Sequence, residues 1–235
     1  MGRLTNQIAE LPMADFALSE TAEIMRRTME ALNGASELPT AKIKVPAGGG
    51  KAFEMPGDDG ADYAKSFDGV ILAAAFANAY WDKPYGSGGD QAPLCASHDG
   101  ISGWDADGME HVCRTCPHNR MGSREGGRGK ACRNKVELLI LLEGQALPVL
   151  LRVPTMSVGN YAQYVARTLS PRGLQPWDVV TSFSLVGATN AGGIAYSQIA
   201  FSCKGRVDAA EAAQLRAAVQ PMMLGAGTDN DKEGE

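Results

Sequence analysis

Four of the five cysteines in the chain fall in one stretch, between Cys95 and Cys132. Cys113 and Cys116 form a CxxC pair, and Cys95 and Cys132 lie about equally far on either side of it. Zinc takes four soft or borderline ligands in a tetrahedron, and a CxxC turn supplies two of them from one tight loop. The surrounding Gly, Asp, Ser, Pro and Asn residues cannot build an apolar core, so a metal would have to hold the segment together. We therefore expect a structural Zn2+ bound by Cys95, Cys113, Cys116 and Cys132.

Other chemistries of these cysteines stay open. Two disulfides are the main alternative, although the N-terminus lacks the basic and apolar regions of a signal peptide. A thioredoxin-like redox site is less favoured, because no strand leads into the CxxC pair and no helix follows it. One of His98, His111 and His118 could replace a cysteine ligand. The fifth cysteine, Cys203, lies in an apolar run and is expected to be an inert core residue.

Positive charge is concentrated in the same part of the chain. Between Cys113 and Lys135 there are seven basic residues and one acid, Glu125, although the chain as a whole carries a net charge of -5. A basic loop on an acidic protein is a local anion site, and nucleic acid is the obvious polyanion. The alternative is a solvated loop whose charges offset those of a zinc tetrathiolate.

Aromatic residues precede the cysteine stretch, and single-stranded nucleic acid binds by base stacking along a basic track. A predicted strand over 41–45 adds further lysines that alternate with apolar residues. The nucleic-acid-binding residues that we predict are Lys42, Lys44, Tyr80, Trp81, Arg124, Arg128, Lys130 and Arg133.

The periodicity of apolar residues predicts a mixed, β-rich α+β protein. The predicted helices cover 19–32, 157–169 with Ser157 as its N-cap, and a last helix opened by Asp208. The predicted strands cover 41–45, 67–81, 136–142, 147–153, 179–186 and 194–207. The strands on the two sides of the cysteine stretch are too few to form separate sheets, so the stretch is an insertion in one domain.

The domain organisation follows from these elements. We expect an N-terminal helical segment at 1–38, an OB-like β-barrel over 39–224 with a zinc-ribbon-like insertion at 93–135, and a disordered acidic tail at 225–235. No apolar run approaches the length of a membrane helix, so we expect a cytoplasmic protein without membrane contact. No nucleotide-binding or hydrolase motif is present, so we do not expect an enzyme.

Several strings resemble bacteriophage and prophage proteins over roughly residues 40–205. They are Gly69-Val-Ile, Asn78-Ala-Tyr80-Trp81, Cys95-Ala-Ser-His-Asp-Gly100, Cys113-Arg-Thr-Cys116-Pro, Gly129-Lys-Ala-Cys132-Arg-Asn, Leu147-Pro-Val-Leu and Pro154-Thr-Met-Ser157. In its overall plan, a barrel with an acidic tail, the chain is also similar to phage single-stranded DNA-binding proteins. The zinc insertion departs from the simplest of those proteins.

The function that we expect is a phage-type single-stranded DNA-binding protein, which coats single strands in replication or recombination inside a bacterial host cell. Its acidic tail would compete for the basic groove or recruit replication and recombination proteins. One alternative is a zinc-ribbon adaptor that binds a polymerase or a host protein, and another is a nuclease with an unrecognised metal site. A homo-oligomer is also open.

Overall fold

The computed structural model describes residues 18–31, 40–46, 48–57, 60–82, 92–126, 129–145, 147–190 and 192–223. Strand β4 (Ser66–Tyr80) runs through the whole molecule. One of its edges pairs with β8 (Arg133–Leu142), antiparallel, from Gly69 opposite Leu142 to Ala79 opposite Arg133. The other edge is shared, because β10 (Val179–Thr189) takes its first residues and β5 (Cys95–Ser97) its last three.

The remaining strands extend this sheet on both sides. Beyond β8 lies β9, and β1 pairs with β9 in parallel; beyond β10 lies β11; beyond β5 lie β6 and then β7. The hairpin of β2 and β3 is a separate two-stranded sheet. The bounds are β1 (Lys42–Ile43), β2 (Phe53–Gly57), β3 (Gly60–Ala64), β6 (Ser102–Asp105), β7 (Glu110–Val112), β9 (Val149–Val153) and β11 (Ala195–Arg206).

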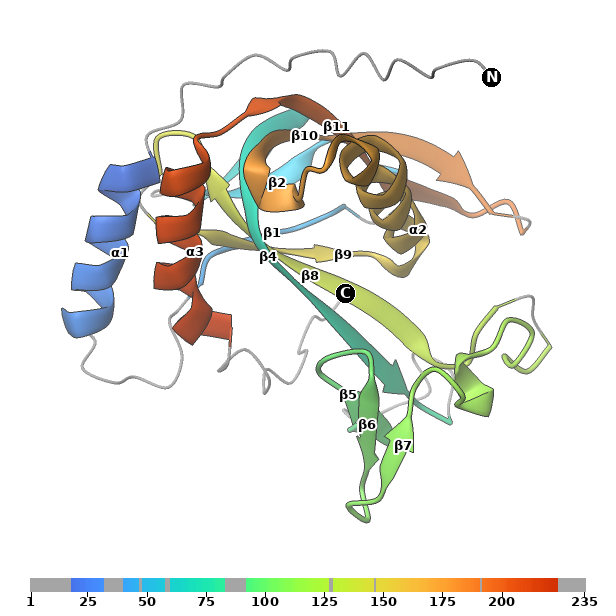
Figure 1. Cartoon of the computed structure of the whole chain (residues 1–235). Coiled ribbons are helices and arrows are strands. Elements are labelled where there is room, and N and C mark those ends of the chain that lie inside the picture. Colours follow the sequence, from blue (N-terminus) through green and yellow to red (C-terminus); the bar gives the residue numbers. More distant parts are fainter. Residues whose placement is uncertain are drawn as a thin grey trace, which may run out of the picture.

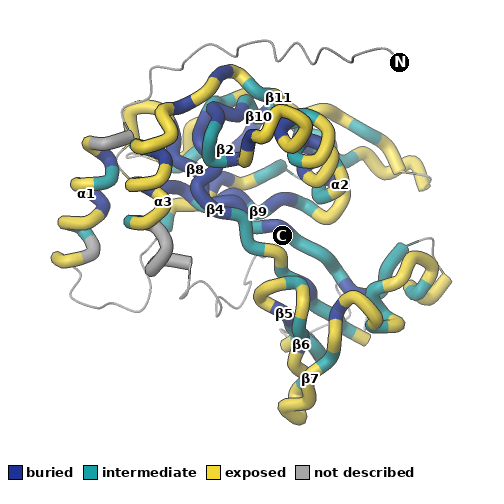
Figure 2. Tube along the Cα trace, viewed as in Figure 1, coloured by how far each residue is buried: buried dark blue, intermediate teal, exposed yellow. Residues whose placement is uncertain are grey.

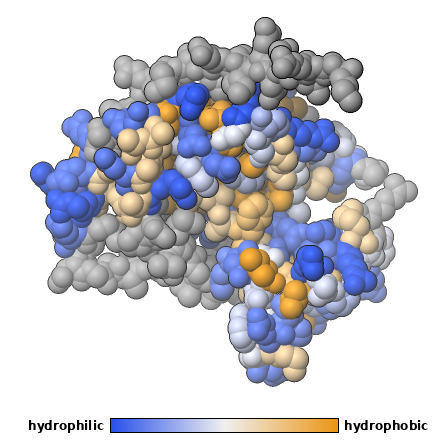
Figure 3. Space-filling view, viewed as in Figure 1, coloured by the Kyte–Doolittle hydropathy of each residue, from blue (hydrophilic) through white to orange (hydrophobic). Residues whose placement is uncertain are grey.

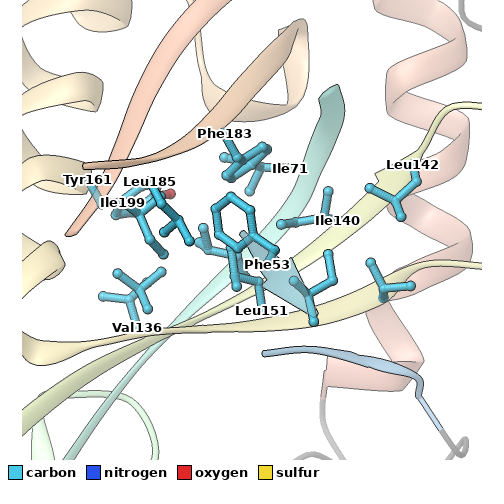
Figure 4. Packing of buried hydrophobic residues seen from close by; sticks show 14 residues of the cluster. Phe53, Ile71, Val136, Ile140, Leu142, Leu151, Tyr161, Phe183, Leu185 and Ile199 are labelled. Carbon is cyan, nitrogen blue, oxygen red and sulfur yellow. The ribbon is translucent and has the colours of Figure 1, made fainter. Parts of the chain in front are cut away.

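Apolar residues are buried on both faces of the central sheet. The cluster on one face is closed by α2 (Thr155–Gln163) and the β2–β3 hairpin, and its largest members include Phe53, Phe183 and Ile199 (Figure 4). On the other face, α1 (Leu18–Ala31) and α3 (Ala209–Met223) pack together and cover a second cluster around Met25, Leu72 and Leu215 (Figures 1 and 2). Burial of each such side chain stabilises the fold by about 1.5–3 kcal/mol, so these clusters hold the body together.

The α+β, β-rich class is therefore confirmed, but the expected OB-like barrel is not. The described strands form no closed barrel; the sheet has open edges at β1 and β11. Residues 44–54 bridge these two edges. Next to β1, Lys44 and Glu54 exchange two backbone hydrogen bonds, and on the β11 side Ser197 Oγ donates to the Gly50 carbonyl at 2.7 Å. Because β1 is only two residues long, it is too short to complete a ladder around a barrel.

Most predicted elements are present, but one helix differs, and a strand, β7, leads directly into Cys113 where none was expected. Helix α2 begins at Thr155, directly after Pro154, so Ser157 is not its N-cap. Ser157 is instead buried, and its Oγ accepts a hydrogen bond from the Ile199 backbone N–H at 2.9 Å. The predicted stretch continues to Leu169 as a π-helix. The Asp208 cap is confirmed, because its Oδ1 accepts the N–H groups of Ala210 and Glu211.

Among the described residues, no helix is long and apolar enough to cross a membrane. The acidic tail, residues 225–235, lies outside the described part of the chain.

Candidate metal centre and nucleic-acid interface

The described residues of 92–135, which we name the cysteine lobe, continue the sheet at one end. β5 pairs with the last residues of β4, β6 pairs with β5, and β7 pairs with β6. A 3-10 turn, η1 (Pro117–Asn119), follows, and the chain then returns into β8. Figure 1 shows the lobe projecting from the body where β4 ends and β8 begins. The strands β5 to β7 therefore form a small extension of the main sheet, and this small sheet has two faces.

The inner face of the lobe carries the cysteines. Side chains alternate along each strand, so directly paired residues share a face. Tyr80 pairs with Cys95, and Cys95 pairs with Asp105, which places all three on this inner face. All four predicted ligands, Cys95, Cys113, Cys116 and Cys132, line a single cavity of about 290 Å³. All four are free thiols.

Short backbone contacts set the positions of the thiols. The Cys113 N–H donates to the Ile101 carbonyl at 2.8 Å, and the Cys116 N–H closes the CxxC turn on the Val112 carbonyl at 3.1 Å. Gly103 leaves the space that the sulfurs occupy, because a Cβ at that position would lie 2.9 Å from Cys95 Sγ and 3.6 Å from Cys113 Sγ. The sulfurs of Cys95 and Cys113 therefore both lie next to one backbone position of β6.

The environment of two of the thiols, Cys95 and Cys132, opposes their ionisation. Burial, followed by the neighbouring cysteines, raises the pKa of Cys132 to about 11. Burial and the nearby cysteines also raise the pKa of Cys95. A divalent cation inverts this balance, since coordination deprotonates a thiol. As the side chains stand, no three His, Cys, Asp or Glu of the described residues are gathered as ligands of one ion. The four thiols share a cavity but do not form a finished tetrahedron.

A polar network supports the cavity from the β4 and β8 side. Asn78, which is buried in β4, accepts a hydrogen bond from Asn134 of β8. Lys130 Nζ donates to Asn134 Oδ1 at 2.9 Å and to Asn119 Oδ1 at 3.0 Å, and Asn119 Nδ2 donates to the Cys113 carbonyl at 2.9 Å. This network joins the CxxC turn to both long strands, so it fixes the lobe to the body.

Two of the three candidate histidines lie at the cavity. His111 Nε2 is 2.8 Å from Asp105 Oδ2, and this contact, followed by the Met109 amide, lowers the pKa of Asp105. His118 stacks on Tyr80 with ring centroids 3.9 Å apart, and both rings line the cavity. His98 is exposed and does not line it. His111 and His118 are therefore the histidines placed to replace or support a cysteine ligand.

The outer face of the lobe carries a row of directly paired residues that crosses five strands. Arg133 lies opposite Ala79, Ala79 opposite Ala96, Ala96 opposite Trp104, and Trp104 opposite Glu110. The Arg133 guanidinium also lies over the ring of Trp81, 4.8 Å from its centroid. The outer face thus places a cation, two tryptophans and two alanines on one surface.

The predicted nucleic-acid-binding residues do not all share this surface. Trp81 and Arg133 lie on the outer face, whereas Tyr80 lies on the inner face against His118. Lys130 belongs to the polar network, and Arg124 is exposed on the loop that leads to it. Lys42 lies on β1, and Lys44 follows that strand and pairs with Glu54 at 2.8 Å. Arg128 lies outside the described residues.

Sequence patterns alone did not single out the residues that shape the cavity. Asn78, Asn119 and Asn134 act through their side chains across three segments, and Gly103 acts through the Cβ that it lacks. One signal was present in the sequence: Asn78 lies within an apolar predicted strand, and strands are depleted in asparagine.

Comparisons with known proteins give no relative for the chain: no protein-family model, no curated protein and no solved structure matches it.

Proposed function

We propose that this protein binds single-stranded DNA without catalysis and coats single strands in replication or recombination, as phage-type proteins of this class do. The observation that carries the proposal is the pair of Arg133 and Trp81 on the outer face of the lobe. A cation beside an aromatic ring can contact a phosphate while the ring stacks on the adjoining base. Lys135, two residues along β8 from Arg133 and on the same face, adds further charge of the sign that a polyanion requires.

We also propose that a structural zinc holds the lobe, with Cys95, Cys113, Cys116 and Cys132 as ligands. The support is that all four thiols line one cavity, where burial raises the pKa of Cys95 and of Cys132 in the absence of a cation. Thiolate ligands would close the coordination sphere, so the ion would have a structural and not a hydrolytic role. The lobe contains few buried apolar side chains of its own, which is typical of a segment that a metal must stabilise.

We also propose that the body is related to an OB-fold in its arrangement of strands, although its strands do not close into a barrel. The approach of the sheet edges through residues 48–54 is the feature that supports it. In OB-folds the strands present one face and adjoining loops to a single strand. Here the corresponding surface would be the continuation of β4 and β8 into the lobe.

A second function is favoured by a different observation. Large apolar side chains are exposed on the lobe, where Figure 3 shows hydrophobic surface; they are Leu94, Ile101, Trp104, Met109, Val112 and Met121. Exposed apolar surface of this kind is common where another protein docks. A zinc-ribbon adaptor that binds a polymerase or a host protein is therefore the alternative.

Fluorescence anisotropy with labelled oligo(dT), measured across a range of salt concentrations, tests the proposal. The chain contains a matched control, because Arg216 lies over the ring of Trp177, 3.6 Å from its centroid, and its helix α3 lies on the body away from the lobe (Figure 1). Arg133→Gln should weaken binding and flatten the salt dependence by roughly 0.7, the value for one single-strand phosphate contact. Arg216→Gln removes the same charge from the same kind of pair and should leave binding unchanged.

Two results would contradict single-strand binding. The first is a wild-type protein with no affinity for oligo(dT) even at low salt, where polyanion binding is strongest. The second is an equal effect of the two arginine variants, which would indicate a response to net charge and not to a site. In either case the adaptor function would take its place.

A further inference from the structure

Trp104 occupies an unusual position on the outer face of the lobe. It lies in β6, the middle strand of the small sheet, yet its side chain is 52% exposed. A tryptophan left half open to water forgoes part of the stabilisation that full burial of a large apolar side chain would provide. The cavity on the inner face explains the neighbouring residues Gly103 and Asp105, but it does not involve Trp104.

The register connects Trp104 to the Arg133–Trp81 pair. In this row only Ala96 and Ala79 lie between Trp104 and Arg133, so no large side chain separates them. Neighbouring strands lie about 4.8 Å apart, so Trp104 on β6 is roughly 10 Å from β4, two strands away. This spacing is within the reach of neighbouring bases of one single strand.

We propose that Trp104 is a second base-stacking site, and that a single strand crosses β4, β5 and β6 at the outer face instead of running along one strand. This inference rests on the proposed function, and it adds the path of the nucleic acid and a residue that contacts it. Stacking on an aromatic ring tolerates any base, as a coating protein requires.

The charges on this face indicate where the nucleic acid is held and where its footprint ends. Arg133 and Lys135 lie on β8 at one end of the face, with Lys135 opposite Ala77. Glu110 lies at the other end, opposite Trp104. A polyanion is attracted to the first end and repelled at the second, so the path of the strand begins over β8, crosses β4, β5 and β6, and stops short of β7. Glu110 marks the limit of the footprint.

The chain has three tryptophans, which makes a direct test practical. The variant Trp81→Phe/Trp177→Phe leaves Trp104 as the single tryptophan and keeps an aromatic ring at position 81. Addition of oligo(dT) should quench its fluorescence. The matching variant Trp81→Phe/Trp104→Phe keeps only Trp177, on the far side of the body, and its fluorescence should not respond.

Affinity provides the second arm. Trp104→Ala should weaken oligo(dT) binding roughly 5- to 150-fold, the range expected for one stacked base, with little change in salt slope. Tyr63, which is 72% exposed on β3 outside the lobe, supplies the control, and Tyr63→Ala should bind as the wild type does. The penalty for Trp104→Ala should grow with oligonucleotide length over about 4 to 16 nucleotides, as more of the path is filled. Parallel titrations with oligo(U) distinguish RNA from DNA as the source of the strand.

The outcomes separate this inference from the function on which it rests. If the wild type binds and Arg133→Gln weakens binding, but Trp104 is neither quenched nor required, the second stacking site is wrong and single-strand binding stands. That result would leave the outer face of β6 to a protein partner. If the wild type does not bind at all, the proposed function itself fails. Circular dichroism of Trp104→Ala checks its folding, and the quenching experiment decides the question if that variant does not fold.

Discussion

A single methyl group added at Gly103 tests whether the cysteines bind a metal. The Cβ of Gly103→Ala would lie 2.9 Å from Cys95 Sγ, whereas packed heavy atoms prefer about 3.5 Å or more. Cys95 Sγ would therefore have to move by about 0.6 Å. A free thiol can rotate away at little cost, but zinc–sulfur bonds hold their length near 2.3 Å within about 0.2 Å. The substitution should thus affect the metal-bound protein more than the metal-free protein.

Overpacking of a fixed site costs about 1–3 kcal/mol, which corresponds to a zinc affinity roughly 5- to 150-fold lower. Competition with a chromophoric chelator measures this affinity, and thermal unfolding of both forms measures folding. Gly159→Ala is the matched control, because Gly159 is exposed in α2 and an added Cβ meets nothing within 4 Å. It should leave zinc binding unchanged and stabilise the helix by about 0.5–1 kcal/mol. If Gly103→Ala folds and binds zinc as tightly as the wild type, Cys95 is not a ligand in the arrangement that the structure gives.

Three further outcomes are expected. Cys116→Ser should abolish stoichiometric zinc, measured by elemental analysis, while the circular dichroism of the central sheet persists; full retention of zinc would contradict this. Lys130→Met should lower lobe stability by about 1–3 kcal/mol without changing the salt slope of DNA binding, because Asn134 Oδ1 loses its donor and Asn119 Oδ1 keeps only Asn134 Nδ2. Arg124→Gln should instead flatten that slope by roughly 0.7 and leave stability unchanged. Deletion of residues 225–235, which carry four acids and one lysine, should tighten oligo(dT) binding at low salt and have less effect as salt screens the charges; equal affinity at low salt would leave the tail without a competing role.

The helices and long strands could be predicted because local patterns determine them, whereas the short strands β5 to β7 of the lobe were not predicted. The apolar run before Trp81 became β4, and the Asp208 cap opens α3 as expected. Ser157 was assigned wrongly because a serine in front of an apolar stretch also suits a buried hydrogen bond to another strand. The partner in that bond, Ile199, is distant in sequence and leaves no local signal.

The site was harder to predict than the elements. The spacing of the cysteines predicted one cluster, and all four do line one cavity. The side on which each neighbour falls depends on register, which single-sequence patterns do not give. Tyr80 and Trp81 are adjacent, yet one lies against His118 at the cavity and the other against Arg133 on the outer face. The predicted barrel was wrong because the number of strands does not determine closure. Closure depends on how far β1 extends, which the sequence pattern does not give.

The most direct test of a metal-held lobe that binds single strands is the oligo(dT) affinity of one preparation before and after zinc removal. Zinc holds β5 to β7 in register with β4 in our proposal, so the chelated protein should bind more weakly, and added zinc should restore the original affinity. Thermal unfolding in parallel should show the body still folded in the chelated form. An affinity that is the same with zinc, with chelator and after zinc is restored would contradict the proposed link between the cysteine lobe and nucleic-acid binding.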